Sequence, residues 1–345
     1  MVHVGLDLSR KKIDVCALSP AGEKLLETNA PPTPEGLARL VASMASMGSI
    51  TAVIESMTGA RFVHDTLEAM GWDVKMADAR KAKGLAPLAC KTDKIDAEVL
   101  ARLSLHDLVP EVWLPSDTVR KERERARYRI FLVHRRSQLK NRIHATLIQF
   151  QEPCPGTDIC GVRGKAVLKQ MDIPDPWKGN MLASLRLIDD LNREIGTCEA
   201  ELKTLGLKHA YMPQLMTIPG IGPILAYTIA SEIGDITRFA TPRKLVGYTG
   251  LSPRVIQSGE KDWRGPLTKT GPKYLRWALI EAATHACHHP AYEPHYNATI
   301  ARLGKRRGPK VARIEVARKL AAAIWMMLSH HTEFAPASPT KSLAA

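Results

Sequence analysis

The chain has 345 residues, of which 45% are hydrophobic, and a formal net charge of +14 at pH 7. This length exceeds what one compact core usually holds, so we expect roughly two or three domains. The charge favours a polyanionic partner, nucleic acid before an anionic membrane, and no run of about 18 apolar residues could span a bilayer.

The N-terminus and the cysteines bear on the compartment. The chain starts with the strand-like run VHVGLDL at 2–8 rather than with a signal peptide. Its six cysteines include no C-x-x-C pair, which argues against structural zinc or a disulfide framework and fits a reducing environment. We therefore expect a soluble cytoplasmic protein with no membrane partner.

Residues 1–115 predict an α/β domain with a mixed sheet. The expected elements are strands at 2–9, 13–20 and 22–29, a helix at 34–47, a strand at 50–56, a helix at 61–71, a strand at 72–78 and a helix from about 91 to 106. The first three strands are separated by polar turns, which is typical of an antiparallel meander. Strands that then alternate with helices imply a mixed sheet with helices on its faces.

Four acidic residues of this region are candidate metal ligands. Asp7 lies within an apolar strand and Glu55 ends a buried one, where an ionised carboxylate is costly unless it is paired or binds a cation. Asp93 and Asp96, three residues apart, lie on one helical face. Mg²⁺ prefers such oxygen ligands. Helix capping by Asp93 is an alternative that the sequence leaves open.

Residues 116–210 predict two long helices. The first runs from 117 to about 150 and carries ten Lys/Arg and two Glu between Arg120 and Arg142, a local charge of +8. The second covers about 180–205 with a heptad seam, so we expect a coiled coil, within one chain or between two. The basic helix is either a solvated face or a nucleic-acid platform. We favour the platform, with Arg135, Arg136, Lys140 and Arg142 as contacts and Tyr128, Phe131 and His134 for stacking.

Residues 211–333 predict a mainly helical domain. The segment TIPGIGPILAYTIASEIGD at 217–235 resembles a helix-hairpin-helix, in which Gly220 and Gly222 would present backbone N–H groups to a phosphate. An ordinary turn between two helices is the alternative. The remaining residues, 334–345, are expected to be a disordered tail.

Six segments, in this order, resemble one known family. They are GLDLS, VIES, KTDKIDAEVLA, IPGIGPILA, GLSPR and QSGEKDWRGPLTKTGPKYLR. They are similar to the DEDD transposases of bacterial insertion sequences, the IS one-ten family, and to their Piv-type DNA invertase relatives. The resemblance covers nearly the whole chain. It implies a ribonuclease H or RuvC-like N-terminal domain, a coiled coil and a mainly α C-terminal transposase domain.

The resemblance also implies an activity, a cofactor and partners in a bacterial cytoplasm. Members recombine DNA, guided by a bridge RNA that the element encodes, and we expect a homo-oligomer, either a dimer or a tetramer. The four acids above would bind Mg²⁺. The family's serine lies in an S-G step after a G-L-x-P-R segment, which falls on Ser258. Many members have two serines before that glycine, whereas Gln257 stands first here.

Four basic residues lie close to Ser258 in the sequence. Arg254, Arg264, Lys269 and Arg276 would neutralise the phosphate under attack. The alternative is that these residues only position the nucleic-acid backbone and that Ser258 is merely a turn residue. Two alternative functions remain open. One is a RuvC-like nuclease that acts on branched DNA with water as the nucleophile, and the other is a nucleic-acid-binding protein without catalysis.

Overall fold

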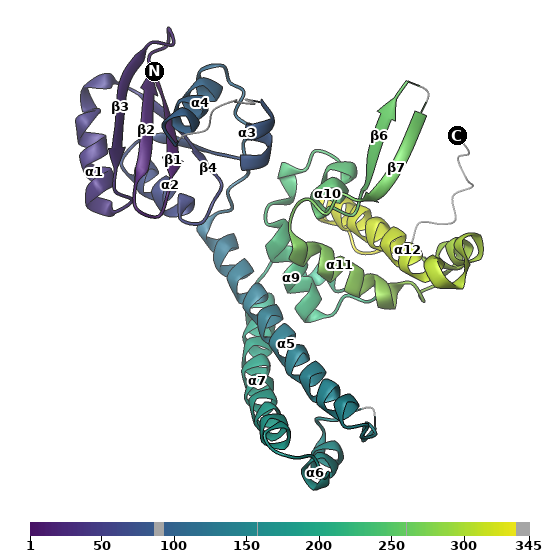
Figure 1. Cartoon of the computed structure of the whole chain (residues 1–345). Helices are drawn as coiled ribbons and strands as arrows, with labels where there is room; N and C mark the ends of the chain where they lie inside the picture. The colour runs from purple at the N-terminus through teal and green to yellow at the C-terminus, as the bar shows by residue number, and fades with distance from the viewer. Residues whose placement is uncertain (86–92, 157, 260, 336–345) are drawn as a thin grey trace. The chain divides into compact units, whose positions relative to one another are not determined.

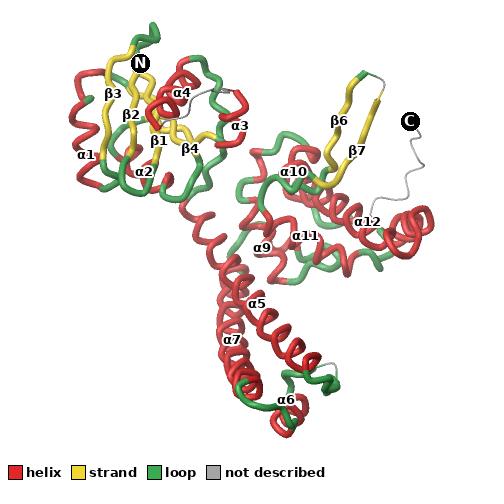
Figure 2. Tube along the Cα trace, in the orientation of Figure 1, coloured by secondary structure: helices red, strands yellow, loops and turns green. Residues whose placement is uncertain are grey.

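The computed structural model describes residues 1–85, 93–156, 158–259 and 261–335. These residues fall into two compact units, Met1–Leu114 and Pro115–Ala345 (Figure 1). The first unit combines strands with helices, whereas the second is mostly helical (Figure 2). The tail that we expected to be disordered lies, from residue 336 onward, outside the described residues.

The first unit contains a five-stranded mixed sheet. Its strands are β1 (Val2–Leu8), β2 (Ile13–Leu18), β3 (Lys24–Ala30), β4 (Ile50–Glu55) and β5 (Asp73–Ala77). They lie in the order β3-β2-β1-β4-β5, with the first three strands antiparallel and with β4 parallel to β1 and β5. The predicted meander and mixed sheet are confirmed, and this arrangement is compatible with a ribonuclease H-like fold.

Helices cover both faces of this sheet. They are α1 (Pro34–Ser43), α2 (Ala60–Ala69), α3 (Ala79–Leu85) and α4 (Asp93–Leu105), with a 3-10 turn η1 (Ala45–Met47). The even-numbered residues of β1 share a core with α1 and α2, whereas α4 packs on the other face. Side chains alternate along a strand, so the odd-numbered residues of β1, Asp7 included, belong to the α4 face.

Two long helices open the second unit and lie side by side (Figure 1). They are α5 (Asp117–Gln149) and α7 (Trp177–Gly206), connected through α6 (Val162–Gln170). The pair is antiparallel, because Arg125 binds Glu201, whereas Arg136, further along α5, donates to Asn192, earlier on α7. Both predicted helices are confirmed, and they pack against each other within one chain.

The rest of the second unit packs around a helical core. Its elements are α8 (Met212–Leu215), α9 (Pro223–Ile233), η2 (Ile236–Arg238), α10 (Pro242–Thr249), β6 (Pro253–Ser258), β7 (Lys261–Leu267), α11 (Lys273–Ala286) and α12 (Glu293–His330). The buried residues Ile229, Leu279 and Leu320 show that α9, α11 and α12 share this core. The hairpin of β6 and β7 projects from these helices (Figure 1).

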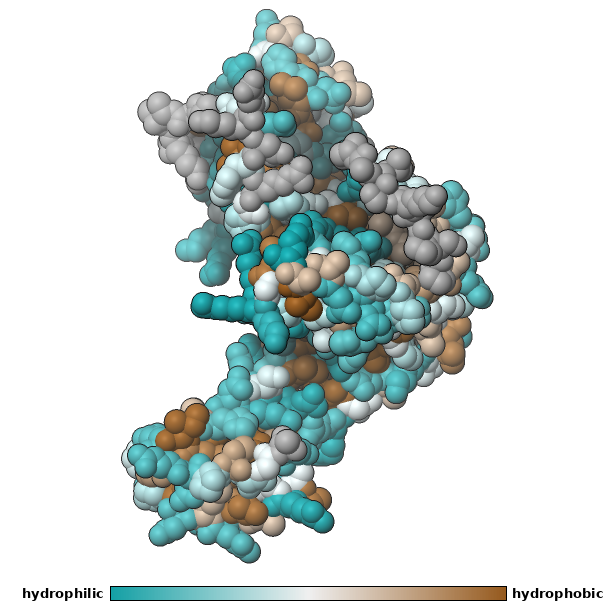
Figure 3. Space-filling view, turned by 90° about the vertical axis from the view of Figure 1, so that its right-hand side faces the viewer, coloured by the Kyte–Doolittle hydropathy of each residue, from teal (hydrophilic) through white to brown (hydrophobic). Residues whose placement is uncertain are grey.

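The face drawn in Figure 3 is mostly hydrophilic, and smaller hydrophobic patches interrupt it. Isolated exposed apolar side chains are ordinary on protein surfaces. In the part of the chain that the structure describes, no helix is both long and apolar enough to cross a membrane.

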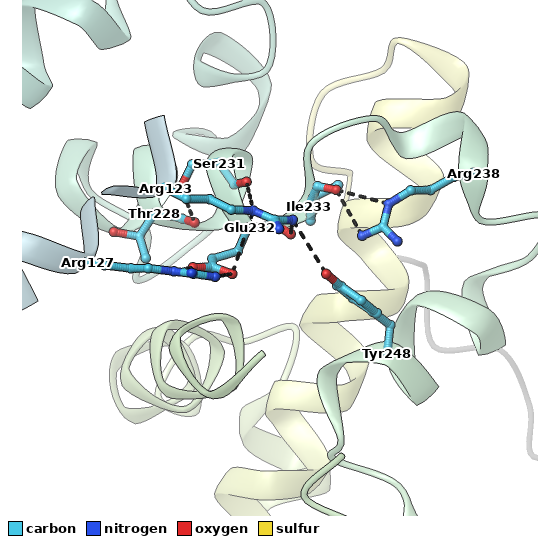
Figure 4. Close-up of polar contacts among 8 residues, drawn as sticks. All are labelled: Arg123, Arg127, Thr228, Ser231, Glu232, Ile233, Arg238 and Tyr248. Atoms are coloured by element: carbon cyan, nitrogen blue, oxygen red, sulfur yellow. Dashed lines mark hydrogen bonds and ion pairs between the residues drawn. The ribbon is translucent and has the colours of Figure 1, made fainter. Parts of the chain in front are cut away.

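Arginines of α5 attach this helix to the C-terminal end of α9 (Figure 4). Arg123 donates from Nε to the carbonyl oxygen of Ser231, at 2.9 Å, and from Nη2 to that of Glu232, at 2.6 Å. Arg127 binds the Glu232 carboxylate with two hydrogen bonds, of 2.6 and 2.9 Å. Burial opposes the charge of Arg127, but its bonds to the fully buried Glu232 outweigh this and raise its pKa.

Replacing Glu232 by Ala should lower the free energy of unfolding by about 3 kcal/mol, because it leaves the guanidinium of Arg127 without its partner. This is the low end for a broken buried pair, since Arg127 is 36% exposed and water can solvate it. Chemical denaturation measures the change. Glu201→Ala is the control: it removes the partner of Arg125 from a surface pair and should cost less than about 1 kcal/mol. Equal losses in the two variants would contradict the structural role of the buried pair.

Candidate functional site

Asp7 and Glu55 lie at the carboxyl ends of two neighbouring parallel strands. β1 and β4 pair in a register that places Leu6 opposite Ile54, so the next residues, Asp7 and Glu55, are neighbours at the same edge of the sheet. Both are partly exposed. The carboxyl ends of parallel strands are where open α/β sheets bind their ligands. This edge is therefore the candidate active site of the first unit.

Gly5 allows α4 to lie directly on β1. A Cβ at this position would come within 1.8 Å of the carbonyl oxygen of Ala97 and 2.6 Å of the backbone nitrogen of Ala101, so a side chain does not fit. Two residues earlier, His3 Nδ1 lies 2.9 Å from Ser104 Oγ. Later residues of β1 thus face earlier residues of α4, and the helix runs antiparallel to the strand.

This direction brings the first turn of α4 to the Asp7 end of β1. A strand rises about 3.3 Å per residue and a helix about 1.5 Å. The step from Gly5 to Asp7 therefore matches about four helical residues back from Ala97, a stretch that contains Asp93 and Asp96. Asp96 is partly exposed. Asp93 is the first residue of α4, and its side chain lies outside the described residues.

These four positions suit a divalent cation by the chemistry of their ligands. All four side chains offer carboxylate oxygens, which Mg²⁺ and similar hard cations prefer. Of the residues whose side chains are described, no three Asp, Glu, His or Cys are close enough together to form a metal site. The argument for a metal site therefore rests on the backbone. The pairing of β1 with β4 and the direction of α4 gather the four acidic positions at one edge of the sheet.

Asp14 is a further acid on this face, and our sequence interpretation missed it. It pairs with Asp7 across β1 and β2 and is only 4% exposed. Its Oδ2 lies 2.8 Å from Lys12 Nζ, in an ionic contact that lacks the angles of a hydrogen bond. The signal was present, because Asp14 interrupts the apolar run IDVCAL just as Asp7 interrupts its own strand.

Ser258 is the last residue of β6 and is exposed. Gly259 follows in the left-handed region, with φ of 57°, and begins the turn. We expected a mainly helical domain here, and the structure adds a β-hairpin that the sequence interpretation did not predict. The overlooked signal is the short turn between the strand-like VIQS and KDW. The Ser258 side chain is accessible, and it lies at the end of a strand.

The basic residues near Ser258 differ in what they contact. Arg254 and Lys269 are exposed. Arg276, on α11, donates from Nη1 to the carbonyl oxygen of Thr249, at 3.1 Å, so it also holds the end of α10. Arg264 lies on β7, and its side chain is outside the described residues. Among these basic residues with described side chains, Arg254 and Lys269 are thus the most accessible candidates for a phosphate contact.

The two glycines of the apolar turn also differ. Gly220 has φ of 83°, and a Cβ there would lie 2.5 Å from the carbonyl oxygen of Ala282 on α11. Close packing of the turn against α11 therefore accounts for this glycine. Gly222 is the exposed N-cap of α9, with open space where a Cβ would be. The helix before the turn, α8, has four residues. Phosphate binding at the N-terminus of α9 remains a prediction, better suited to Gly222.

Acids of the same chain neutralise much of the first half of α5. Arg125 binds Glu201 and Arg129 binds Glu199, both on α7. Arg123 and Arg127 are engaged by α9, as described above. The local charge of +8 is thus not all available to a partner molecule, which the sequence pattern alone did not reveal.

The middle of α5 presents aromatic side chains to solvent, and its second half presents basic ones. Arg135 and Arg142 are exposed, and Arg136 and Lys140 are partly exposed. Tyr128 and Phe131 are 47% and 45% exposed, with their rings stacked at a centroid distance of 6.2 Å. The Arg135 guanidinium lies 4.7 Å from the Phe131 ring centroid. Such a surface suits stacked bases and phosphates.

Comparisons with known proteins agree with the sequence resemblance. A family model for the DEDD domain of IS110 transposases matches residues 4–151, and a model described as "Transposase IS116/IS110/IS902 family" matches residues 212–297. The chain is 27% identical to the transposase of insertion sequence element IS1328 from Yersinia enterocolitica, over 96% of this chain and 98% of that protein. It is 24% identical to the transposase of IS1111A from Coxiella burnetii, over 96% and 90%.

Proposed function

This chain belongs to the IS110 family of insertion-sequence transposases, and we propose that it cleaves and rejoins DNA through Ser258, with Mg²⁺ bound by Asp7, Glu55, Asp93 and Asp96. We also propose that a bridge RNA encoded by the element guides the reaction. The observation that supports the acidic site best is the register of β1, β4 and α4, which gathers the four acidic positions at one edge of the sheet.

The proposed reaction divides the work among residues of this chain. The Ser258 Oγ forms a bond to phosphorus while one P–O ester bond breaks, and the departing oxygen gains the proton that the serine loses. A phosphoserine link keeps the energy of the phosphodiester, so the strand can be rejoined. Bound Mg²⁺ would supply charge that activates the nucleophile and stabilises the leaving oxygen. Arg254 and Lys269 would neutralise the phosphate.

The two groups of catalytic residues belong to different parts of the chain. We assign residues 1–115 to the acidic site, 116–210 to a coiled coil that binds RNA, and 211–333 to a transposase domain that carries the serine. The reaction then draws on both units, from one chain or from two chains of a dimer or tetramer. Crosslinking of the DNA-bound protein, followed by mass measurement, tests the oligomeric state.

We expect the RNA platform to lie on the second half of α5. Replacing Arg135, Arg136, Lys140 and Arg142 by Ala should weaken binding of the RNA transcribed from the flank of the element. It should also reduce the slope of log affinity against log salt by about 3. The slope is proportional to the number of phosphate contacts, because each contact releases counterions from the nucleic acid, and the variant loses four contacts. Filter binding at several salt concentrations measures both effects.

Arg125 and Arg129 provide the matched control for this experiment. They lie on the same helix, but Glu201 and Glu199 already neutralise them. Replacing both by Ala should change the salt slope little. A slope that falls equally in the two variants would show that α5 attracts RNA by its total charge, and an unchanged slope in the fourfold variant would remove α5 from the RNA contact.

A cleavage assay with and without Mg²⁺ separates the proposed function from its alternatives. A recombinase yields metal-dependent strand cleavage and a covalent protein–DNA intermediate. A RuvC-like nuclease that uses water yields metal-dependent cleavage with free ends. A protein that only binds nucleic acid cleaves nothing in either condition.

A further inference from the structure

Trp263 shares one face of the β6–β7 hairpin with Ser258. In the register of this hairpin, Trp263 pairs with Ile256, and Ser258 pairs with Lys261. Paired residues of antiparallel strands point to the same face, as do residues two apart on one strand. Ser258, Ile256 and Trp263 are therefore on one face, while Val255 and Gln257 are on the other.

This face carries a large apolar surface that nothing in the described residues covers. Trp263 is 57% exposed and Ile256 is 58% exposed. β6 and β7 form a sheet of two strands, to which the described residues add no third. An isolated two-stranded ribbon gains little from exposing an indole to water. By contrast, Trp72 is 6% exposed, in the core of the first unit.

Gly265 makes room for the indole on the ribbon. A Cβ at Gly265 would lie 2.7 Å from Cζ3 and 2.8 Å from Cη2 of Trp263, so the six-membered ring lies over this glycine. The ring thus rests along β7, on the side of Trp263 away from the turn. Since Ser258 pairs with Lys261, the ring is roughly 7–14 Å from the serine along the ribbon, at about 3.4 Å per residue.

Charge argues for a nucleic acid rather than a protein as the occupant of this face. Residues 253–273 contain five Lys/Arg and two acids, and the exposed Arg254 and Lys269 are among them. A second copy of the ribbon would bring like charges together. A DNA strand offers phosphates for the cations and a flat base for the indole, and base–aromatic stacking contributes roughly 1–3 kcal/mol per base.

We propose that Trp263 stacks on a base of the DNA strand near the phosphodiester that Ser258 attacks, and thereby positions that strand for the reaction. This proposal rests on the assignment of Ser258 as the nucleophile. The separation along the ribbon corresponds to roughly two to four steps of DNA at about 3.4 Å each. The stacked base is therefore a few nucleotides from the scissile phosphate.

The test uses the full chain, its guide RNA and a DNA duplex with 2-aminopurine at each of the four positions on either side of the cleavage site. Stacking on an indole should quench 2-aminopurine fluorescence at one or two of these positions. Trp263→Ala should abolish this quenching and weaken DNA binding by about tenfold. Trp263→Phe, which keeps an aromatic ring, should retain most of both. Because the side chain is exposed, Trp263→Ala should melt at the wild-type temperature.

Two further variants serve as controls for this experiment. Val255→Ala removes an exposed apolar side chain from the opposite face and should leave quenching and affinity unchanged. Ser258→Ala should keep the quenching while it loses the covalent intermediate, which separates this proposal from the assignment of the nucleophile. Quenching that survives in Trp263→Ala at every position would overturn the proposal. So would a Trp263→Ala variant that binds DNA normally but changes its oligomeric state, because the indole would then contact protein.

Discussion

Replacing Asp7 by Asn should reduce DNA strand cleavage by about a thousandfold while the protein stays folded. The substitution preserves shape but removes a ligand charge, and a bound metal ion contributes several kcal/mol to the stabilisation of the transition state. Glu55→Gln and Asp96→Asn should have similar effects, because their backbones lie at the same edge of the sheet. Cleavage of a labelled DNA duplex in Mg²⁺ measures the loss.

Glu98→Gln is the matched control for these substitutions. It also removes one carboxylate from α4, two residues beyond Asp96, but this carboxylate binds Lys24 and Arg102. Hydrogen bonds from Lys24 and then Arg102 hold the pKa of Glu98 below its usual range, which fits a structural ion pair. Cleavage by Glu98→Gln should stay near the wild-type rate. Near-normal cleavage by all three variants of Asp7, Glu55 and Asp96 would refute the metal site.

Metal binding can be followed without any cleavage. Mg²⁺ that binds only the folded protein should raise the melting temperature of the wild type as its concentration increases. Asp7→Asn should lose this response, whereas Glu98→Gln should keep it. Asp93 begins α4, so Asp93→Asn should also lose the response. Asp93→Ala should in addition lower the stability in the absence of metal by roughly 1 kcal/mol, because Asn can cap a helix about as well as Asp whereas Ala cannot.

Replacing Ser258 by Ala should abolish the covalent protein–DNA intermediate altogether. The wild-type protein, incubated with DNA and its guide RNA and then denatured, should carry DNA on the tryptic peptide from Val255 to Lys261. Mass spectrometry identifies this peptide. Ser258 is accessible at the end of β6. If it is the proposed nucleophile, a phosphoserine link conserves the energy of the phosphodiester until the strand is rejoined.

Two other serines serve as controls for this assignment. Ser252, just before β6, is partly exposed, so Ser252→Ala should form the intermediate normally. Ser231 is fully buried and donates its hydroxyl to the carbonyl oxygen of Thr228, so it cannot reach DNA in this fold. An intermediate on Ser252 would keep the mechanism and move the nucleophile. Robust metal-dependent cleavage that never forms an intermediate would favour water as the nucleophile.

The secondary structure and the candidate residues followed from local patterns. Short apolar or alternating runs predicted the strands of the first unit, and a heptad seam predicted α7 within a few residues of its ends. Asp7 and Glu55 stood out because a charge in an apolar strand is costly wherever the strand lies. The positive charge along α5 could also be counted directly from the sequence. Each of these signals depends on residues close together in the chain.

Only the tertiary structure decided which of these residues meet. Strand register, which makes Asp7 and Glu55 neighbours, depends on how two faces pack, and no local period encodes it. The direction of α4 depends on its contact with Gly5, more than 90 positions earlier in the chain.

The sequence also does not reveal which arginines of α5 are neutralised by acids of the same chain. Arg127 and Arg129 look alike in the sequence, yet one binds a buried acid of α9 and the other a partly exposed acid of α7. Their partners lie 105 and 70 positions away. The sequence therefore determined which chemistry the chain carries. Packing between distant segments decided where that chemistry is gathered and how much of the charge remains for nucleic acid, because the free energy of a buried contact depends on both of its partners.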